Sequence, residues 1–344
     1  MKYIKKFKTH SGYETYKDSE DYTTPNVSYC VEQTEVHYEK YVRDYSKEYL
    51  TFEAVEDTTF QFTKDGLSYS LDNGDTWVSL AADTATPTVS AGNKIMFKGE
   101  ITPPSSGGIG KFSSTGEFNA SGNIMSLLYG DNFIGQTDLT GKNETFGYIF
   151  EGNTDLIDVG NMALPATTLS ERCYHNMFSG CAGLTTAPEL PATTLAEYCY
   201  YYMFYGCTSL TTAPELPATT LANYCYANMF GGCTGLATAP ELPATTLAEY
   251  CYYYMFLGCT SLTAGPELPA TTLTNGCYSH MFYGCTNLNY IKAMFTTTPS
   301  PGYTINWVGG VASTGTFVKN SAATWTTTGA NGIPSGWTVQ TASA

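Results

Sequence analysis

The sequence predicts an α+β fold in which a solenoid of short repeats follows a small antiparallel β-sandwich and is closed by a C-terminal β-rich cap. The motif LPATTL occurs five times at a fixed step of 26 residues, beginning at Leu164, Leu190, Leu216, Leu242 and Leu268. Each copy continues into a C-Y-x-x-M-F-x-G-C-x-x-L segment. Short β-rich runs, separated by turn residues such as Asp65-Gly66, precede these copies. A constant period of this length is typical of repeats that bury their apolar faces only by stacking on one another.

Composition limits the classes of partner. The 344 residues are 42% apolar and 14% charged, which is enough for ordinary globular cores in two or three domains. The formal net charge of −15 comes from 31 acidic and 16 basic residues. An acidic chain of this kind repels phosphate backbones and anionic membrane surfaces, so we expect neither nucleic acid nor lipid headgroups as partners.

The N-terminal segment, residues 1–48, is expected to form a short helix around residues 13–17, followed by a hairpin. Four lysines within the first eight residues precede no apolar run of the length that a secretory signal needs. No stretch of about 18 apolar residues that could span a bilayer is found either. We therefore expect no classical signal peptide and no membrane insertion.

Residues 49–125 are expected to form the antiparallel β-sandwich. Within it the segment SLDNGDTW, from Ser70 to Trp77, resembles the Asp-box S-x-D-x-G-x-T-W, a hairpin known from sialidases and other β-proteins. Asp72 can accept backbone N–H bonds across such a turn, and Gly74 supplies a positive φ. Sialidase chemistry would require three arginines, and the chain has only two. We interpret the motif as a turn.

Both ends of the solenoid are expected to be capped by degenerate sequence. Residues 126–163 contain FGYIFEGNTDL, which aligns with the first repeat if Phe150 matches Phe178, a step of 28 rather than 26. Asn153 then takes the place of a repeat cysteine. Residues 290–344 begin a sixth repeat that we expect to remain incomplete, followed by hairpins rich in Gly, Thr and Trp that shield the open end.

Within the five full repeats, residues 164–289, each unit is expected to contain one short strand and one short helix. Thr194 and Glu197 fit a capping box, and the same pair recurs in the first and fourth copies. Apolar residues follow at four-residue spacing, as along one side of a helix. Gly206 is a fitting helix stop. The remaining half of each repeat is then extended.

This pattern resembles the BspA-like leucine-rich repeats of bacterial surface proteins, which have the layout L-P-x-x-L … A-F-x-x-C-x-x-L. The resemblance covers about 125 of the 344 residues. The period of 26 exceeds the lengths more common in the family, Met-Phe replaces Ala-Phe, and each repeat has an extra cysteine. The resemblance implies adhesion or protein–ligand recognition without enzymatic activity.

Ten repeat cysteines form two columns with five members each: Cys173, Cys199, Cys225, Cys251, Cys277, and Cys181, Cys207, Cys233, Cys259, Cys285. Zinc sites prefer closer cysteine pairs, and five thiols in a column cannot all form disulfides. We favour two ladders of buried free thiols that pack as small apolar groups. No metal and no cofactor are expected.

The positions that vary between repeats are the candidate contacts with a ligand: Tyr201, Tyr202, Tyr205, Tyr253, Tyr254, Tyr283, His175, His280, Asn176 and Asn228. Exposed tyrosine supplies stiff, amphipathic contact area at protein and sugar interfaces. The alternative, that some of these tyrosines merely cover the core, stays open at this point. A second candidate is the in-register line Glu189, Glu215, Glu241 and Glu267, which we interpret as a solvated edge, with a cation such as calcium as the alternative.

No catalytic motif is recognisable, although sequence alone does not exclude a carboxylate pair of a glycan hydrolase. We favour an exposed component of a phage or phage-like particle that recognises a bacterial surface ligand and contacts other particle proteins. The alternative is a BspA-like cell-surface adhesin that binds host or bacterial proteins or glycans. Both place the protein on a virion or cell surface.

Overall fold

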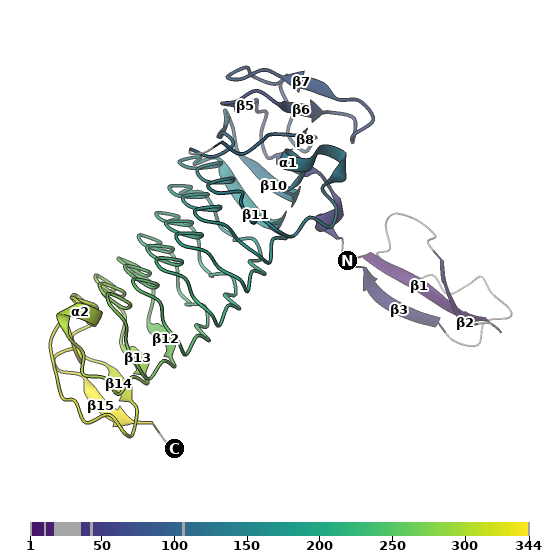
Figure 1. Ribbon diagram of the computed structural model, residues 1–344. Helices are drawn as coiled ribbons and strands as arrows, with labels where there is room; N and C mark the ends of the chain where they lie inside the picture. Colours follow the sequence, from purple (N-terminus) through teal and green to yellow (C-terminus); the bar gives the residue numbers. More distant parts are fainter. Residues whose placement is uncertain (1, 10–11, 17–35, 42–43, 105–106, 343–344) are drawn as a thin grey trace. The chain divides into compact units, whose positions relative to one another are not determined.

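The computed structural model describes residues 2–9, 12–16, 36–41, 44–104 and 107–342. They form a mixed α+β protein, mostly sheet with few helices. The chain divides into two compact units, Met1–Asp44 and Tyr45–Ala344, and each is described by itself. Figure 1 shows the elements of both units.

The first unit is a three-stranded antiparallel sheet of β1 (Lys2–Thr9), β2 (Gly12–Tyr16) and β3 (Val36–Tyr41), in the order β2-β1-β3. The helix expected around residues 13–17 is wrong for residues 13–16, because Tyr13 pairs with Lys8 across β1 and β2. The alternating sequence GYETY has the two-residue period of a strand. Cys30 lies outside the described residues.

The second unit begins with the 3-10 turn η1 (Tyr45–Lys47) and two small sheets. The larger sheet has the order β11-β10-β4-β8-β6-β7, and every pair in it is antiparallel except β10 with β11. Its strands are β4 (Leu50–Ala54), β6 (Leu67–Ser70), β7 (Val78–Leu80), β8 (Lys94–Gly99), β10 (Phe118–Asn123) and β11 (Leu156–Ala163). The second sheet pairs β5 (Phe60–Phe62) with β9 (Phe112–Ser114), and α1 (Ser126–Tyr129) and η2 (Gly130–Asn132) follow β10.

A phenylalanine cluster joins these two sheets and the first turn of the repeats. The Phe52 ring lies 4.9 to 5.1 Å from four others, those of Phe60, Phe97, Phe112 and Phe118. It also lies 5.8 Å from Phe150, which belongs to the stack of repeats. All these rings are fully buried or 1% exposed, so sheets and repeats share one core.

The helix expected in each repeat is wrong. Residues 133–300 are all described and contain no helix. In its place the chain makes an arc of consecutive four-residue turns, in which every fourth residue has a positive φ: Tyr198 (56°), Tyr202 (56°) and Gly206 (72°) in the second copy. A left-handed residue every fourth position interrupts the helical ladder of backbone bonds. Thr194, expected as a helix cap, instead forms parallel bridges with Thr168 and Thr220.

Backbone hydrogen bonds explain why the arcs stack. Amides along an arc alternate between a partner three residues back and a carbonyl in the next repeat. For example, Tyr201 N donates to Tyr198 O (3.2 Å), and Tyr202 N donates to Ala227 O (3.1 Å). Half of the arc amides therefore depend on the following repeat. A single arc leaves those groups unpaired, so the repeats are stable only as a stack.

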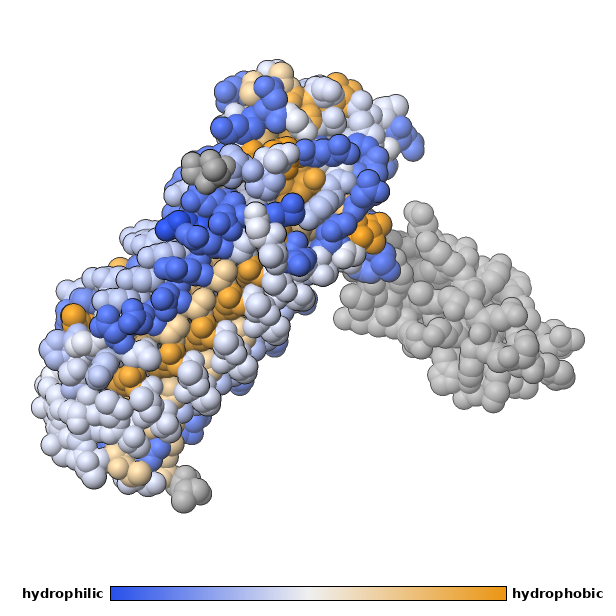
Figure 2. Space-filling model, viewed as in Figure 1, coloured by the Kyte–Doolittle hydropathy of each residue, from blue (hydrophilic) through white to orange (hydrophobic). Residues whose placement is uncertain are grey.

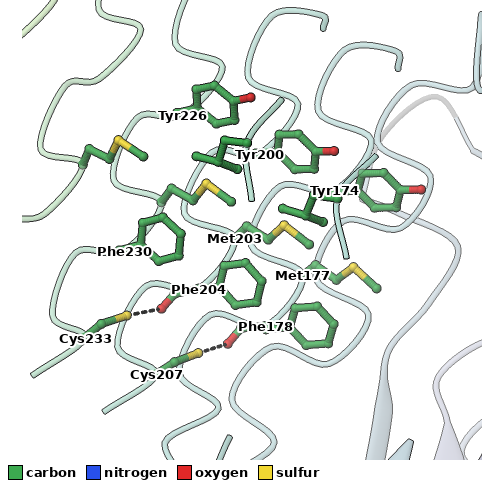
Figure 3. Packing of buried hydrophobic residues seen from close by; sticks show 14 of the residues in the cluster. Tyr174, Met177, Phe178, Tyr200, Met203, Phe204, Cys207, Tyr226, Phe230 and Cys233 are labelled. Carbon is green, nitrogen blue, oxygen red and sulfur yellow. Dashed lines mark hydrogen bonds between the residues drawn. The ribbon is translucent and has the colours of Figure 1, made fainter. Parts of the chain in front are cut away.

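The turn period of four points two side chains inward and two outward in each turn. In the second copy Cys199, Tyr200, Met203 and Phe204 are buried, and equivalent residues lie in register in the neighbouring repeats, as Figure 3 shows. Successive phenylalanine rings from Phe150 to Phe282 lie 5.5 to 5.8 Å apart, and the tyrosine rings from Tyr174 to Tyr278 lie 5.8 to 6.0 Å apart. The core is thus a set of continuous aromatic and sulfur columns.

One member of the tyrosine column gives a prediction. The Tyr174 hydroxyl is buried and has no hydrogen-bond partner among the described residues. We expect Tyr174→Phe to raise the free energy of unfolding by about 1 kcal/mol, because it removes an unsatisfied polar group. Urea denaturation measures this. The control is Thr304→Val, which removes a buried hydroxyl that donates to Asn331 O at 2.8 Å and should destabilise. A clear loss of stability in Tyr174→Phe would contradict the prediction.

The segment 146–156, which we expected to match the first repeat, stacks directly on that repeat. The Phe150 ring lies 5.6 Å from Phe178 at an interplanar angle of 4°, and Phe146 lies 5.6 Å from Tyr174. Phe150 N donates to Met177 O (3.0 Å), as in the arcs that follow. The longer step of 28 residues therefore leaves the column unbroken.

The expectation of an incomplete sixth repeat followed by hairpins is wrong. Four parallel strands continue the stack: β12 (Ala264–Leu268), β13 (Tyr290–Ala293), β14 (Thr316–Lys319) and β15 (Thr338–Thr341). Between β13 and β14 the chain passes through α2 (Pro301–Thr304) and completes an arc, in which Phe282 N donates to Trp307 O (2.8 Å). The 26-residue step from Tyr290 to Thr316 outlasts the sequence motif, since a backbone ladder does not require particular side chains.

Polarity is uneven over the second unit. On the face drawn in Figure 2, hydrophilic residues gather near the sheets, and the C-terminal end of the stack is paler. An apolar stripe also runs along the repeats on this face. No helix in the described part of the chain is long and apolar enough to cross a membrane.

Candidate functional site

The ten predicted contact residues lie on the outward positions of the arcs, with unequal exposure. Tyr205 and Tyr283 are the most exposed, at 37% and 42%. Six are half-buried: Tyr201, Tyr202, Tyr253, Tyr254, His280 and Asn176. His175 and Asn228 are buried, at 4% and 2% exposure, so the structure does not present them to a ligand. For His175 the cause is local, because its ring packs 4.4 Å from Tyr148 and its Nδ1 bonds to Arg172 O.

Seven of these residues form two clusters of ring contacts, named together here the tyrosine face: Tyr201, Tyr202 and Tyr205 in one, and Tyr253, Tyr254, His280 and Tyr283 in the other. The Tyr201 and Tyr202 rings meet edge to face at 4.4 Å, and Tyr202 meets Tyr205 at 4.9 Å. Two repeats further on, Tyr253 meets Tyr254 at 4.3 Å. Edge-to-face and offset contacts at these distances are favourable and hold the rings in fixed orientations.

His280 completes this surface in the fifth repeat. Its ring stacks on that of Tyr254 at 4.4 Å, and Tyr283 lies 6.0 Å away. Its Nδ1 is buried without a hydrogen-bond partner among the described residues. Burial lowers the pKa of the imidazole, which favours the neutral ring. The fifth repeat therefore adds an uncharged ring to the tyrosine face.

Variation between repeats follows an alternation of large and small side chains. The third repeat carries Ala227, Asn228 and Gly231 where the second carries three tyrosines. A Cβ added at Gly231 would lie 2.9 Å from Cδ2 of Tyr205, so the tyrosine occupies the space above this glycine. Ala227 and Asn228 are likewise buried. The two readings of the variable tyrosines therefore coexist, because the same rings cover a smaller repeat and leave their outer edges exposed.

The tyrosine face carries no formal charge. Burial is the main cause that raises the pKa of Tyr253 to about 12, and a hydrogen bond with Tyr254 adds to it. The pKa of Tyr201 is raised for the same reasons, with Tyr202 as its partner. These phenols stay protonated at neutral pH and can donate hydrogen bonds. The arc segments 199–206, 225–232, 251–258 and 277–284 contain no Asp, Glu, Lys or Arg.

Sequence reasoning missed a second column of aromatic residues. Tyr198, Tyr224 and Tyr250 stack face to face at 4.7 and 4.8 Å, and the Arg172 guanidinium lies 4.8 Å from the Tyr198 ring. A Cβ added at Gly276 would lie 2.2 Å from Tyr250 Cε1, so the last ring lies flat against this glycine. The available signal was a tyrosine directly before the first arc cysteine in three consecutive copies. Because Arg172 covers the first ring and Gly276 lies against the last, we interpret this column as structural.

The glutamate line is exposed along its whole length, at Glu189, Glu215, Glu241 and Glu267. Its last member accepts a hydrogen bond from Lys292 Nζ at 2.8 Å. Among the described residues no group of three His, Cys, Asp or Glu side chains is placed to hold a metal ion. Apart from the alignment of these four carboxylates, no feature of the described residues supports a bound cation along this line.

The ten repeat cysteines are buried and free. In the second column each thiol donates to a phenylalanine carbonyl of the preceding repeat, as in Cys207 Sγ to Phe178 O at 3.1 Å and Cys233 Sγ to Phe204 O at 3.0 Å. Figure 3 shows these two bonds. Burial raises the pKa of Cys233 to about 12, so the thiolate is strongly disfavoured at neutral pH. These groups are packing and hydrogen-bonding elements, not nucleophiles.

Thiol reactivity tests this assignment. We expect the ten repeat cysteines of the native protein to react negligibly with a thiol reagent at neutral pH, because reaction needs an accessible thiolate. After denaturation without reductant, all ten repeat cysteines should react. Protein that is first reduced and then denatured is the control and should give the same count. Finding most of the ten thiols blocked in the unreduced, denatured protein would contradict the thiol ladders.

The Asp-box segment is a hairpin turn between β6 and β7. Asp72 Oδ1 accepts bonds from Ser70 Oγ (2.7 Å) and Thr76 N (2.9 Å), and Trp77 Nε1 donates to Gly74 O (3.0 Å). The hydrogen bonds from Thr76 are the largest cause that lowers the pKa of Asp72 to about 2. The interpretation of this motif as a turn is confirmed.

A shallow hollow of about 520 Å³ lies beside this hairpin, between residues 71–73 and 88–94. Its lining includes one cationic group, Lys94, which pairs with Glu53 at 2.9 Å. The lining thus supplies no pair of converging acids for catalysis. The tyrosine face is the better candidate for recognition.

Comparison with known proteins found no matching family model, no matching curated protein and no matching solved structure.

Proposed function

We propose that this chain is a non-enzymatic binding protein whose tyrosine face recognises a ligand on a bacterial or host cell surface. The observation that carries the proposal is an uncharged, half-exposed aromatic surface on a chain of net charge −15. Its rings are held by contacts of 4.3 to 4.9 Å, so little side-chain freedom is lost when a partner docks. Neutral glycans and uncharged protein patches both suit such a surface.

The finer architecture belongs to the same proposal. We interpret the stack as a solenoid related to the BspA-like leucine-rich repeats, and the two packed sheets before it as a small sandwich. The inter-repeat backbone bonds and the unbroken aromatic columns support the solenoid. In this interpretation, the arcs with four-residue turns stand where other repeats of this kind have short helices.

For the location, we propose an exposed component of a phage or phage-like particle, in which other structural proteins of the particle are further partners. The alternative is a bacterial cell-surface adhesin, which the resemblance of the repeats favours. Antibody labelling of purified particles and of intact cells separates the two. Signal only on cell envelopes would exclude the particle.

The binding experiment uses substitutions that the repeats themselves suggest. Tyr202 and Tyr254 occupy left-handed positions at which two other copies carry Asn176 and Asn228. Asparagine tolerates this conformation, so Tyr202→Asn with Tyr254→Asn should preserve the backbone. We expect the double variant to bind intact cells or a glycan array at least tenfold more weakly, since a tyrosine that acts as an interface hot spot costs about 2 kcal/mol or more when it is truncated.

The matched control is Tyr290→Asn, at a tyrosine of 37% exposure on β13, outside the tyrosine face. It should bind like the parent protein. Equal binding by the double variant and the parent would show that recognition takes place elsewhere.

A further inference from the structure

Among the described residues, the last strand of the stack forms an open sheet edge. Within the part of the chain that the structure describes, β15 pairs with β14 alone. Thr338 N donates to Gly315 O (2.9 Å) and Ala342 N to Lys319 O (2.8 Å). Because successive amides of a strand alternate in direction, those of Val339 and Thr341 point away from β14. All four residues of β15 are exposed, and none is a lysine or proline of the kind that protects natural edges.

The apolar face of this sheet is also not fully covered at β15. Ile291, Phe317 and Val339 are register partners on neighbouring parallel strands, so their side chains share one face. Ile291 and Phe317 are fully buried, whereas Val339 is 46% exposed. The opposite end of the stack differs, since its first ring, Phe150, contacts Phe52 and Phe112 and is fully buried. Among the described residues, the column is therefore partly uncovered at β15 and covered at Phe150.

The same end of the stack carries few charged side chains. Among the Asp, Glu, Lys, Arg and His side chains, residues 293–344 contain only Lys319, in a chain of net charge −15. Its Nζ donates to Trp325 O at 3.0 Å and lies 5.5 Å from that ring. Figure 2 shows this end pale on the face drawn. Two copies of an acidic chain repel each other over most of their surfaces, and this neutral end is where the repulsion is weakest.

We propose that β15 is a self-association edge, at which two copies of this chain pair end to end through antiparallel β15 strands. A two-fold axis places the outward N–H and C=O groups of Val339 and Thr341 opposite the same set in the second copy. The pairing joins two four-stranded sheets into one and brings the exposed Val339 side chains beside the partner strand. This inference does not depend on the proposed ligand of the tyrosine face. A dimer of this kind would carry two tyrosine faces, and binding through both at once would add avidity.

Sedimentation of the full chain tests the proposal. We expect the mass to rise towards twice the monomer mass with concentration, and Val339→Lys and Thr341→Pro to stay monomeric. Lysine places a charge at the apolar column, and proline removes an outward amide where a monomer tolerates it. The matched control is Val78→Lys, on the edge strand β7 with 50% exposure, which should associate like the parent.

Three results would overturn the proposal. The parent could remain monomeric up to about 1 mM, a range in which even a weak interface becomes populated. Both β15 variants could associate like the parent, which would place the contact elsewhere. Val78→Lys could abolish association as completely as the β15 variants, which would assign the effect to charge alone. Circular dichroism of each variant confirms that it is folded.

Discussion

Replacing Phe230 with alanine is expected to lower the free energy of unfolding by about 3–5 kcal/mol. Phe230 is fully buried in the middle of the phenylalanine column, between Phe204 at 5.7 Å and Phe256 at 5.8 Å. Its backbone is held on both sides, because Phe204 N donates to Met229 O and Phe230 N donates to Met255 O. These bonds keep neighbouring arcs at a fixed separation, so the surroundings cannot collapse into the space that the ring leaves.

Urea denaturation followed by circular dichroism measures the effect. Phe230→Leu is the control, because it retains most of the volume and should cost about 1 kcal/mol. A similarly small cost for the alanine variant would show that the arcs move together after the ring is lost. It would also show that the backbone bonds between repeats set their spacing less firmly than the structure indicates.

Sequence identified the stacking of repeats and most of the inner residues, because both leave a strict period. Cys199, Met203 and Phe204 recur every 26 residues and are buried in every copy. The invariant tyrosine after the first arc cysteine recurs in the same way, yet its burial was not anticipated. Tyrosine is ordinarily read as a surface residue, whereas Tyr200 here packs between two identical rings.

The arcs could not be distinguished from helices by local pattern. Apolar pairs separated by four residues fit both, since the difference from 3.6 is small over two turns. The distinguishing feature is a positive φ at residues such as Tyr198 and Tyr202, which bulky side chains disfavour. Hydrogen bonds to the next repeat stabilise this conformation, and a propensity argument on one repeat does not include them.

The sequence predicted on which arc positions the candidate contact residues lie, but not how exposed each of them is. Tyr205 and Tyr283 are exposed as expected, whereas Asn228 is buried despite occupying the same arc position as Tyr202. In the same repeat, Tyr205 of the preceding repeat occupies the space above Gly231, so a large side chain there extends over a small one. The completed arc before β14 was missed because its backbone ladder carries no motif. Contacts between neighbouring repeats therefore decide how exposed each outward side chain is and where the stack continues, and the repeat period alone does not show either.

Gly122→Ala is expected to have a comparably large effect where β10 meets residues 46–49. Gly122 lies in β10 with φ of +79°, and a Cβ there would lie 2.0 Å from the Tyr49 carbonyl oxygen. The next residue holds the two segments together, since Asn123 N donates to Glu48 O at 2.8 Å and its side chain donates to Ser46 O at 2.7 Å. The methyl group must displace backbone that is fixed by these bonds. We expect a loss of about 4 kcal/mol or more in the free energy of unfolding.

Gly92→Ala separates the clash from the conformational strain. Gly92 has nearly the same φ, +80°, but a Cβ there would meet nothing within 4 Å. Its cost should be limited to the strain of the left-handed region, about 1–2 kcal/mol. The excess measured for Gly122→Ala then reports how firmly residues 46–49 are held against β10. If the two variants lose equal stability in urea, the segment yields to a methyl group, and the close approach of backbone at Gly122 does not fix residues 46–49 against β10.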